Sequence, residues 1–299
     1  MNEINNLYIK GGTMQNVKNL PGKYAETHSP AREARHIPKL THGEAGGLAT
    51  AELERTLALL ETLSTEDWPR PTACTLWKVQ ELVSHLAGAC AGHASWAEFK
   101  RQYVQNPHLP EAAVKVDGIN RRQVEDRAGA TPTALITELR EVGPKAICTR
   151  QRLPWLLRII PVPFGPPLGT VPIGYLTDLI YIRDMWMHRL DICRATGREM
   201  TLTAAHDGRI VALVMRDLGQ MLHPELKERR IRVELTGPAG GTFDFGRGSV
   251  PSATIQMDAL DFNWLASGRM TADEAMSEVL TRGDTEQARW FLAHTEVPY

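Results

Sequence analysis

One helix, expected from about Tyr175 to Ala195, carries two side chains of the kind that bind metal ions. Asp184 and His188 are four residues apart, so a helix places them on one face with Cβ atoms about 6 Å apart. The neighbouring positions are apolar, namely Met185, Met187, Leu190 and Ile192. A helix that is apolar on most sides is buried, and a buried carboxylate or imidazole needs a partner. The segment therefore predicts a buried helix whose Asp184 and His188 bind one ion.

The same helix offers a supporting carboxylate. Asp191 follows His188 by three residues, and from there it can accept the second N–H of the imidazole, which fixes the tautomer and raises ligand basicity. The bland alternative is an exposed Asp–His pair, because this spacing occurs by chance in many helices.

A further histidine, His85, lies among apolar residues on a helix that we expect to begin at Thr75 and to continue to Tyr103. Taken alone, His85 reads as a core histidine that is hydrogen-bonded to a neighbour. His93 lies about 12 Å further along such a helix, too far to share an ion with His85, and is interpreted as structural.

Composition limits the function classes. A formal net charge of −1 argues against a nucleic-acid partner, and no apolar run is long enough for a membrane span. The cysteines form no CxxC pair and the start lacks a secretory apolar run, which together indicate a reducing cytoplasm. The four cysteines are Cys74, Cys90, Cys148 and Cys193. For Cys74 a small buried role is favoured over that of a reactive thiol.

The chain divides into three parts by pattern. Residues 1–44 have little apolar periodicity and are expected to form a mobile leader. Residues 45–200 read as an all-α bundle, in which one helix begins at a Thr-Pro cap at Thr131 and ends at Gly143-Pro144. Residues 152–172 are expected to form a proline-rich loop. Residues 201–299 alternate in the manner of strands at 231–235, 242–245 and 253–257, and are expected to form a small α+β domain.

Three separated motifs resemble one known family. The segments at 67–88, 183–198 and 258–269 are similar, in order, to the mycothiol-dependent maleylpyruvate isomerases. The likeness covers about residues 45–290. It implies a DinB-like four-helix bundle followed by a domain similar to sterol carrier proteins.

Carried over by position, the resemblance implies that His85, Asp184 and His188 are the metal ligands. The family is expected to have Glu where this chain has Asp184, which puts the metal preference in doubt. Zinc is the expected ion, with iron, nickel or manganese as alternatives. The family also implies a low-molecular-weight thiol such as mycothiol, and a cytoplasmic monomer or homodimer.

The substrate implied by the resemblance is a small molecule, expected to carry a carboxylate, and the reaction an isomerisation or an S-transfer. Arg269 matches a position suspected to be catalytic in the C-terminal domain, although a solvated arginine after a helix cap is an equal alternative. Two other functions stay open. One is a metal enzyme of different chemistry, either a hydrolase or an Fe(II)-dependent oxidase, and the other is a non-catalytic binding protein.

Overall fold

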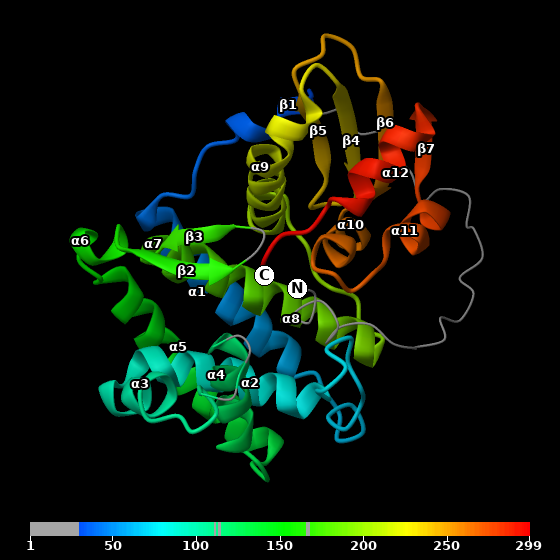
Figure 1. Ribbon diagram of the computed structural model, residues 1–299. Coiled ribbons are helices and arrows are strands. Elements are labelled where there is room, and N and C mark those ends of the chain that lie inside the picture. The colour runs from blue at the N-terminus through cyan, green and yellow to red at the C-terminus, as the bar shows by residue number, and fades with distance from the viewer. Residues whose placement is uncertain (1–29, 111, 113–114, 166–167) are drawn as a thin grey trace. The chain divides into compact units, whose positions relative to one another are not determined.

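The computed structural model describes residues 30–110, 112, 115–165 and 168–299 (Figure 1). These residues form two compact units. The first comprises residues 41–163 and 170–200, and the second comprises the remaining described residues. No helix among the described residues is long and apolar enough to cross a membrane.

Four helices make the core of the first unit: α1 (His42–Leu60), α2 (Val79–Ala94), α5 (Pro132–Gln151) and α8 (Tyr181–Thr196). Helix α5 packs on α1 and α2, and α8 packs on the same two helices. Two shorter helices, α3 (Trp96–Tyr103) and α4 (Lys115–Glu125), lie against α2. Apolar side chains from the bundle and from the loop before α2 fill its interior, among them Leu53, Leu60, Leu82, Leu86, Leu135, Leu139 and Met185.

The start of α2 differs from the sequence-based expectation. Thr75 does not cap this helix, because the chain between Trp68 and Val79 forms turns and an isolated bridge first. Lys78 is the N-cap residue, and its backbone N–H donates to the side chain of Glu81. The helix ends at Ala94 because Ser95 is extended, so α3 is a separate helix rather than a continuation.

Helix α5 begins at the expected cap, where the Thr131 hydroxyl accepts a hydrogen bond from the Ala134 N–H. The prediction that it ends at Gly143-Pro144 is wrong, since the helix runs on to Gln151. A proline costs one hydrogen bond within a helix, but the packing of α5 on α1 and α2 offsets that loss. Gly143 permits this packing, because a Cβ there would lie 2.6 Å from the Leu53 side chain.

The proline-rich segment is more regular than a loop. It contains α6 (Trp155–Arg158) and the paired strands β2 (Pro161–Gly165) and β3 (Gly169–Pro172). The chain then enters α7 (Ile173–Tyr175), a π-helical turn (Leu176–Ile180) and α8. Helix α8 ends at Gly197 in the left-handed conformation, φ 70°, as the sequence predicts.

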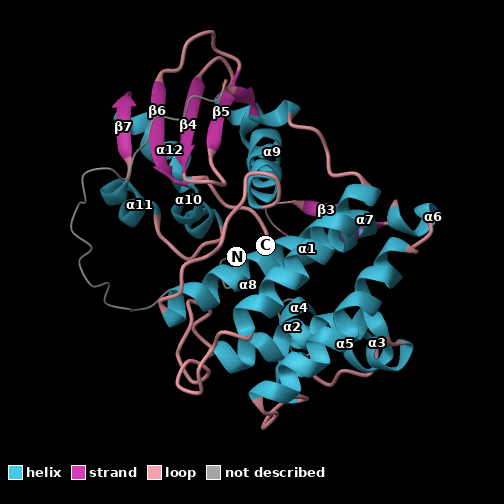
Figure 2. Cartoon of the chain, turned by 180° about the vertical axis from the view of Figure 1, so that it is seen from behind, coloured by secondary structure: helices cyan, strands magenta, loops and turns pink. Residues whose placement is uncertain are grey.

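The second unit is built on a five-stranded sheet in the order β1-β5-β4-β6-β7. Its strands are β1 (Arg32–Glu33), β4 (Arg230–Thr236), β5 (Gly241–Gly246), β6 (Ala253–Asp258) and β7 (Leu280–Gly283). Strand β4 pairs antiparallel with β5 and parallel with β6. Its helices are α9 (Asp207–Leu226), α10 (Ala259–Ala266), α11 (Ala272–Glu278), α12 (Thr285–Ala293) and the 3-10 turn η2 (Ala34–His36). Helix α12 covers one face of the sheet, as the opposite views of Figures 1 and 2 show together.

The predicted fold class, a helical bundle followed by a small α+β unit, is confirmed. Residues 1–29 of the predicted leader lie outside the described residues. The described remainder of that segment is regular structure, because β1 pairs in parallel with β5, the turn η2 packs on α9, and α1 begins at His42. The short elements β7 and α11 were not predicted from the sequence.

Candidate metal centre

Two helices bring three potential ligands together inside the first unit. His85 comes from the middle of α2, and Asp184 and His188 come from successive turns of α8. The His85 Nε2 atom lies 3.3 Å from Oδ2 of Asp184, and the His188 Nε2 atom lies 3.3 Å from Oδ1. The two imidazoles are 5% and 6% exposed, whereas Asp184 is 23% exposed. The carboxylate therefore stands between two buried rings and has one side towards solvent.

Gln123 of α4 fixes the orientation of His85. Its amide oxygen Oε1 lies 2.8 Å from His85 Nδ1, and since this oxygen can only accept, Nδ1 carries the proton. Its amide nitrogen donates to Oε1 of Gln102, whose own amide nitrogen donates to the Gly88 carbonyl. This chain of buried amides keeps Nε2 of His85 directed at Asp184.

Asp191 holds the second imidazole in the same way. Its Oδ2 atom accepts a hydrogen bond from His188 Nδ1 at 2.8 Å, and its side chain is fully buried. The Cys74 thiol donates to the same oxygen at 3.6 Å and lies 3.9 Å from His188 Nδ1. Cys74 is buried, as expected, and it also contacts the carboxylate that orients His188.

An aromatic wall covers the two imidazoles. The Trp77 ring stacks on His85 with centroids 5.0 Å apart, and it is tilted against His188 at 6.2 Å. His93 is not part of this cluster. Its Nε2 atom instead forms a 2.5 Å hydrogen bond with the Tyr181 hydroxyl, in agreement with its predicted structural role.

The electrostatics of the cluster favour opposite charges at its centre. Burial acts to raise the pKa of Asp184, but the charges and hydrogen bonds of His85 and His188 outweigh it and hold that pKa well below its usual range. Burial acts to lower the pKa of His188, and the charge of Asp184 outweighs this effect and raises it well above the ordinary value. The site thus stabilises positive charge between these side chains.

The geometry fits a divalent cation. The ligand atoms of His85, Asp184 and His188 all lie within 4.8 Å of one another. Bonds of about 2.1 Å in a tetrahedral arrangement put neighbouring ligand atoms about 3.4 Å apart, close to the 3.3 Å N···O separations here. Each imidazole also has an acceptor on its second nitrogen, as metal-binding histidines normally do. Three protein ligands leave room for a further exchangeable one.

The arginines near these motifs have other partners. Arg189 forms a buried ion pair with Glu52 of α1, and Arg183 donates to the Tyr175 hydroxyl. Arg269 follows α10 in the second unit, where its guanidinium lies 5.8 Å from the Trp264 ring centroid. Its predicted catalytic role stays a prediction.

Sequence reasoning missed Gln123 and Trp77. The sequence separation of His85 and Gln123 corresponds to no helical spacing. Gln123 lies on α4 and contacts His85 only because α4 packs on α2. No feature of the sequence around Trp77 distinguishes it from the other tryptophans of the chain. The glycine at position 88 carried a usable signal, since a Cβ there would lie 2.5 Å from the Gln123 side chain.

Comparisons with known proteins agree with this picture. Residues 49–193 match the family described as the mycothiol maleylpyruvate isomerase N-terminal domain. Two solved structures, a mycothiol-dependent maleylpyruvate isomerase and a single-residue mutant of such an isomerase, are 14% and 13% identical to the chain. Each has a TM-score of 0.52 and covers 81% of this chain and 93% of its own. At this identity they establish the shared fold. No curated protein matched the chain.

Proposed function

Residues 49–193 belong to the mycothiol maleylpyruvate isomerase N-terminal domain family, and we propose that the chain is a metal-dependent enzyme that uses a low-molecular-weight thiol. The observation that carries the proposal is the convergence of His85, Asp184 and His188, with both imidazoles oriented by acceptors on their second nitrogens. Such orientation directs both Nε2 atoms at Asp184, as binding of one ion by the three side chains requires.

Each residue has a defined task in this proposal. His85 and His188 present Nε2 lone pairs from opposite helices, and Asp184 supplies the anionic ligand and faces solvent. A divalent cation held there would favour the thiolate form of a bound thiol, which is the nucleophilic form. Trp77 covers the rings on one side and limits water access. The open side at Asp184 is where thiol and substrate would enter.

The reaction class follows from thiolate chemistry. Addition of the thiolate to an activated carbon–carbon double bond converts it to a single bond, about which the substrate rotates. Elimination then restores the double bond in the other geometry and releases the thiol, so the net reaction is an isomerisation. Attack at an electrophilic carbon with loss of a leaving group would instead be an S-transfer. The proposed substrate is a small carboxylate-bearing molecule.

Turnover of maleylpyruvate with mycothiol tests the proposal. We expect activity in the metal-loaded chain that requires the thiol. Asp184→Asn should reduce it by more than the roughly 10–100-fold caused by loss of an outer ligand partner. Asp273→Asn is the matched control, because Asp273 is 86% exposed on α11. It should leave activity unchanged.

The alternatives predict different results. Strict dependence on iron and oxygen, without thiol, would replace the thiol reaction by Fe(II)-dependent oxidation, since the same donor set suits that ion. Thiol-independent hydrolysis would identify a metal hydrolase. Full metal binding without turnover of any thiol–substrate pair would identify a binding protein.

A further inference from the structure

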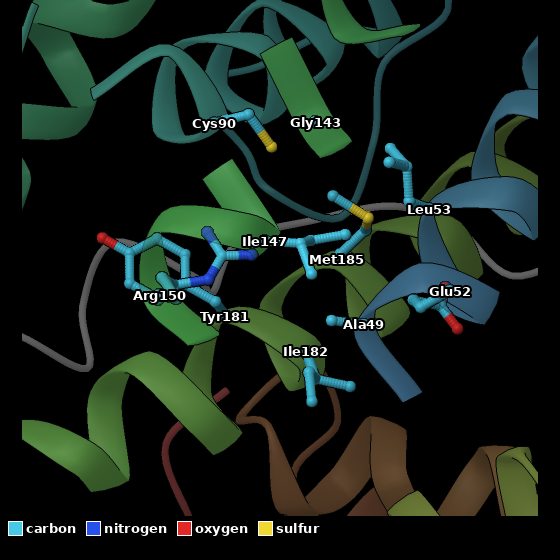
Figure 3. Close-up of a pocket in the computed structure, with 10 residues that line it drawn as sticks. All are labelled: Ala49, Glu52, Leu53, Cys90, Gly143, Ile147, Arg150, Tyr181, Ile182 and Met185. Carbon is cyan, nitrogen blue, oxygen red and sulfur yellow. The ribbon is translucent and has the colours of Figure 1, made fainter. Parts of the chain in front are cut away.

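A narrow cavity lies within the first unit, between α1, α2, α5 and the start of α8 (Figure 3). It encloses about 240 Å³ including its opening to solvent, and its interior has room for about one water-sized group. Most of the wall is apolar, formed by Ala49, Leu53, Cys90, Gly143, Ile147, Ile182 and Met185. Neither the proposed metal ligands nor the thiol chemistry accounts for this space.

A buried cation points into the cavity. Arg150, in the last turn of α5, is 6% exposed, and its Nη1 atom is buried without a hydrogen-bond partner. Its guanidinium lies over the Tyr181 ring, 4.8 Å from the centroid. Figure 3 shows the guanidinium directed towards the middle of the lining residues, while the Tyr181 hydroxyl points away from them.

The lining supplies no negative charge for Arg150. Glu52 is the single carboxylate among the ten lining residues. Its oxygens accept hydrogen bonds from Arg189 at 2.7 and 3.1 Å, and Figure 3 shows its carboxylate turned away from the cavity. Ring stacking and the negative end of the α5 dipole offset part of the cost of burying the charge. Neither provides an acceptor for Nη1.

Three polar side chains near Arg150 are neutral. Burial, assisted by the Arg150 charge, lowers the pKa of His93 to about 3, so this ring is uncharged at neutral pH. Burial raises the pKa of Tyr181, which stays a phenol and is engaged with His93 and Tyr103. Burial also raises the pKa of Cys90 to about 11, which leaves its thiol protonated as a weak donor. None of these three side chains therefore supplies an anionic acceptor for Arg150.

We propose that Arg150 binds a monatomic anion of the size of chloride in this cavity. A guanidinium within an apolar wall suits a singly charged anion that loses its hydration at low cost. The narrow interior excludes phosphate and larger oxyanions. None of the ten lining residues is a proposed metal ligand, so binding of the anion needs no metal.

Chloride is the probe, and formate, with three non-hydrogen atoms, tests the size of the site. The full chain is prepared in chloride-free sodium methanesulfonate, and either anion is added at constant ionic strength. We expect chloride to give a saturable rise in Tm and a saturable ³⁵Cl line broadening, and formate to give no such rise and not to reverse the broadening. Arg150→Met should abolish both effects, and Arg150→Lys should retain them with weaker affinity. Arg152→Met is the matched control, because Arg152 is exposed two residues further along the chain.

Three results would overturn the proposal. A wild-type chain without saturable broadening or Tm shift holds water only. Effects that survive in Arg150→Met place the anion elsewhere. Broadening lost equally in Arg152→Met reports surface charge rather than the cavity. If Arg150→Met does not fold, wild type is compared with Arg150→Lys. Identical affinity of these two proteins for chloride would contradict binding by the guanidinium group. His188→Ala should leave anion binding unchanged, which separates this test from that of the metal centre.

Discussion

Gln123 accepts a hydrogen bond from Nδ1 of His85 at 2.8 Å, across the packing of α4 on α2. This contact fixes the tautomer of His85 that leaves Nε2 free to bind a cation. Replacement by methionine keeps the volume and removes the acceptor. Gln123→Met is therefore expected to weaken zinc affinity about 10–100-fold, as measured by competition with a chromogenic chelator. Gln220→Met, exposed on α9, should have wild-type affinity. Unchanged affinity in Gln123→Met would show that the amide has a packing role alone.

Asp184 is expected to act through its charge and its reach. Asp184→Asn keeps the shape but removes the anionic ligand, so bound metal measured after dialysis should fall to a small fraction of one ion per chain. Asp184→Glu keeps the carboxylate and gives it the longer side chain that the family resemblance leads one to expect. It should retain metal and change the order of preference among zinc, nickel and manganese. Full metal content in Asp184→Asn would exclude Asp184 as a ligand.

The ion pair between Glu52 and Arg189 holds α1 against α8. Both side chains are almost fully buried, at 0% and 2% exposed, and the guanidinium makes two hydrogen bonds to the carboxylate. Removal of one partner leaves an uncompensated buried charge, so Glu52→Gln is expected to reduce the free energy of unfolding by about 3–5 kcal/mol. Glu54→Gln, exposed on the same helix, should change it by no more than about 0.5 kcal/mol. Urea denaturation measures both, and equal effects would contradict this assignment.

The structure could be predicted from the sequence where local pattern decides it. The burial of α8, the spacing of Asp184 and His188, and the glycine cap at Gly197 all follow from helix geometry within one segment. The strands β4, β5 and β6 could also be predicted, from the alternation of apolar and polar residues and from the turns between them.

The remainder depended on contacts between distant segments. His85 faces Asp184 only because α2 and α8 pack together. Apart from the family resemblance, nothing in the sequence around His85 identifies it as a ligand. Helix α5 passes through Pro144 because tertiary packing outweighs one lost hydrogen bond. Strand β1 exists through its pairing with β5, some 200 residues away. No local pattern encodes such pairings.

His93 makes stability depend on pH. Its pKa in the folded state is lowered to about 3 by burial and by the charge of Arg150, whereas in the unfolded chain it is about 6.5. Below pH 6.5, His93 binds a proton in the unfolded chain but not in the folded chain. The free energy of unfolding therefore falls as pH falls from 6.5 towards 3. His93→Gln keeps a hydrogen-bond partner for Tyr181 and does not titrate.

Between pH 6 and 4, the difference in free energy of unfolding between wild type and His93→Gln is expected to change by at most about 1.4 kcal/mol per pH unit. Denaturation at a series of pH values measures it. The exposed His294→Gln should run parallel to wild type. A constant offset for His93→Gln across this range would show that His93 is protonated in the folded chain.

The metal content of the purified full chain, measured by elemental analysis beside circular dichroism, tests the central claim most directly. The account predicts one divalent ion per wild-type chain and its loss in His85→Ala and in His188→Ala, with helical content retained. The matched variant His93→Ala, which alters a half-buried histidine of the same helix as His85, should keep the ion. Full metal content in both His85→Ala and His188→Ala would contradict the assignment of the centre.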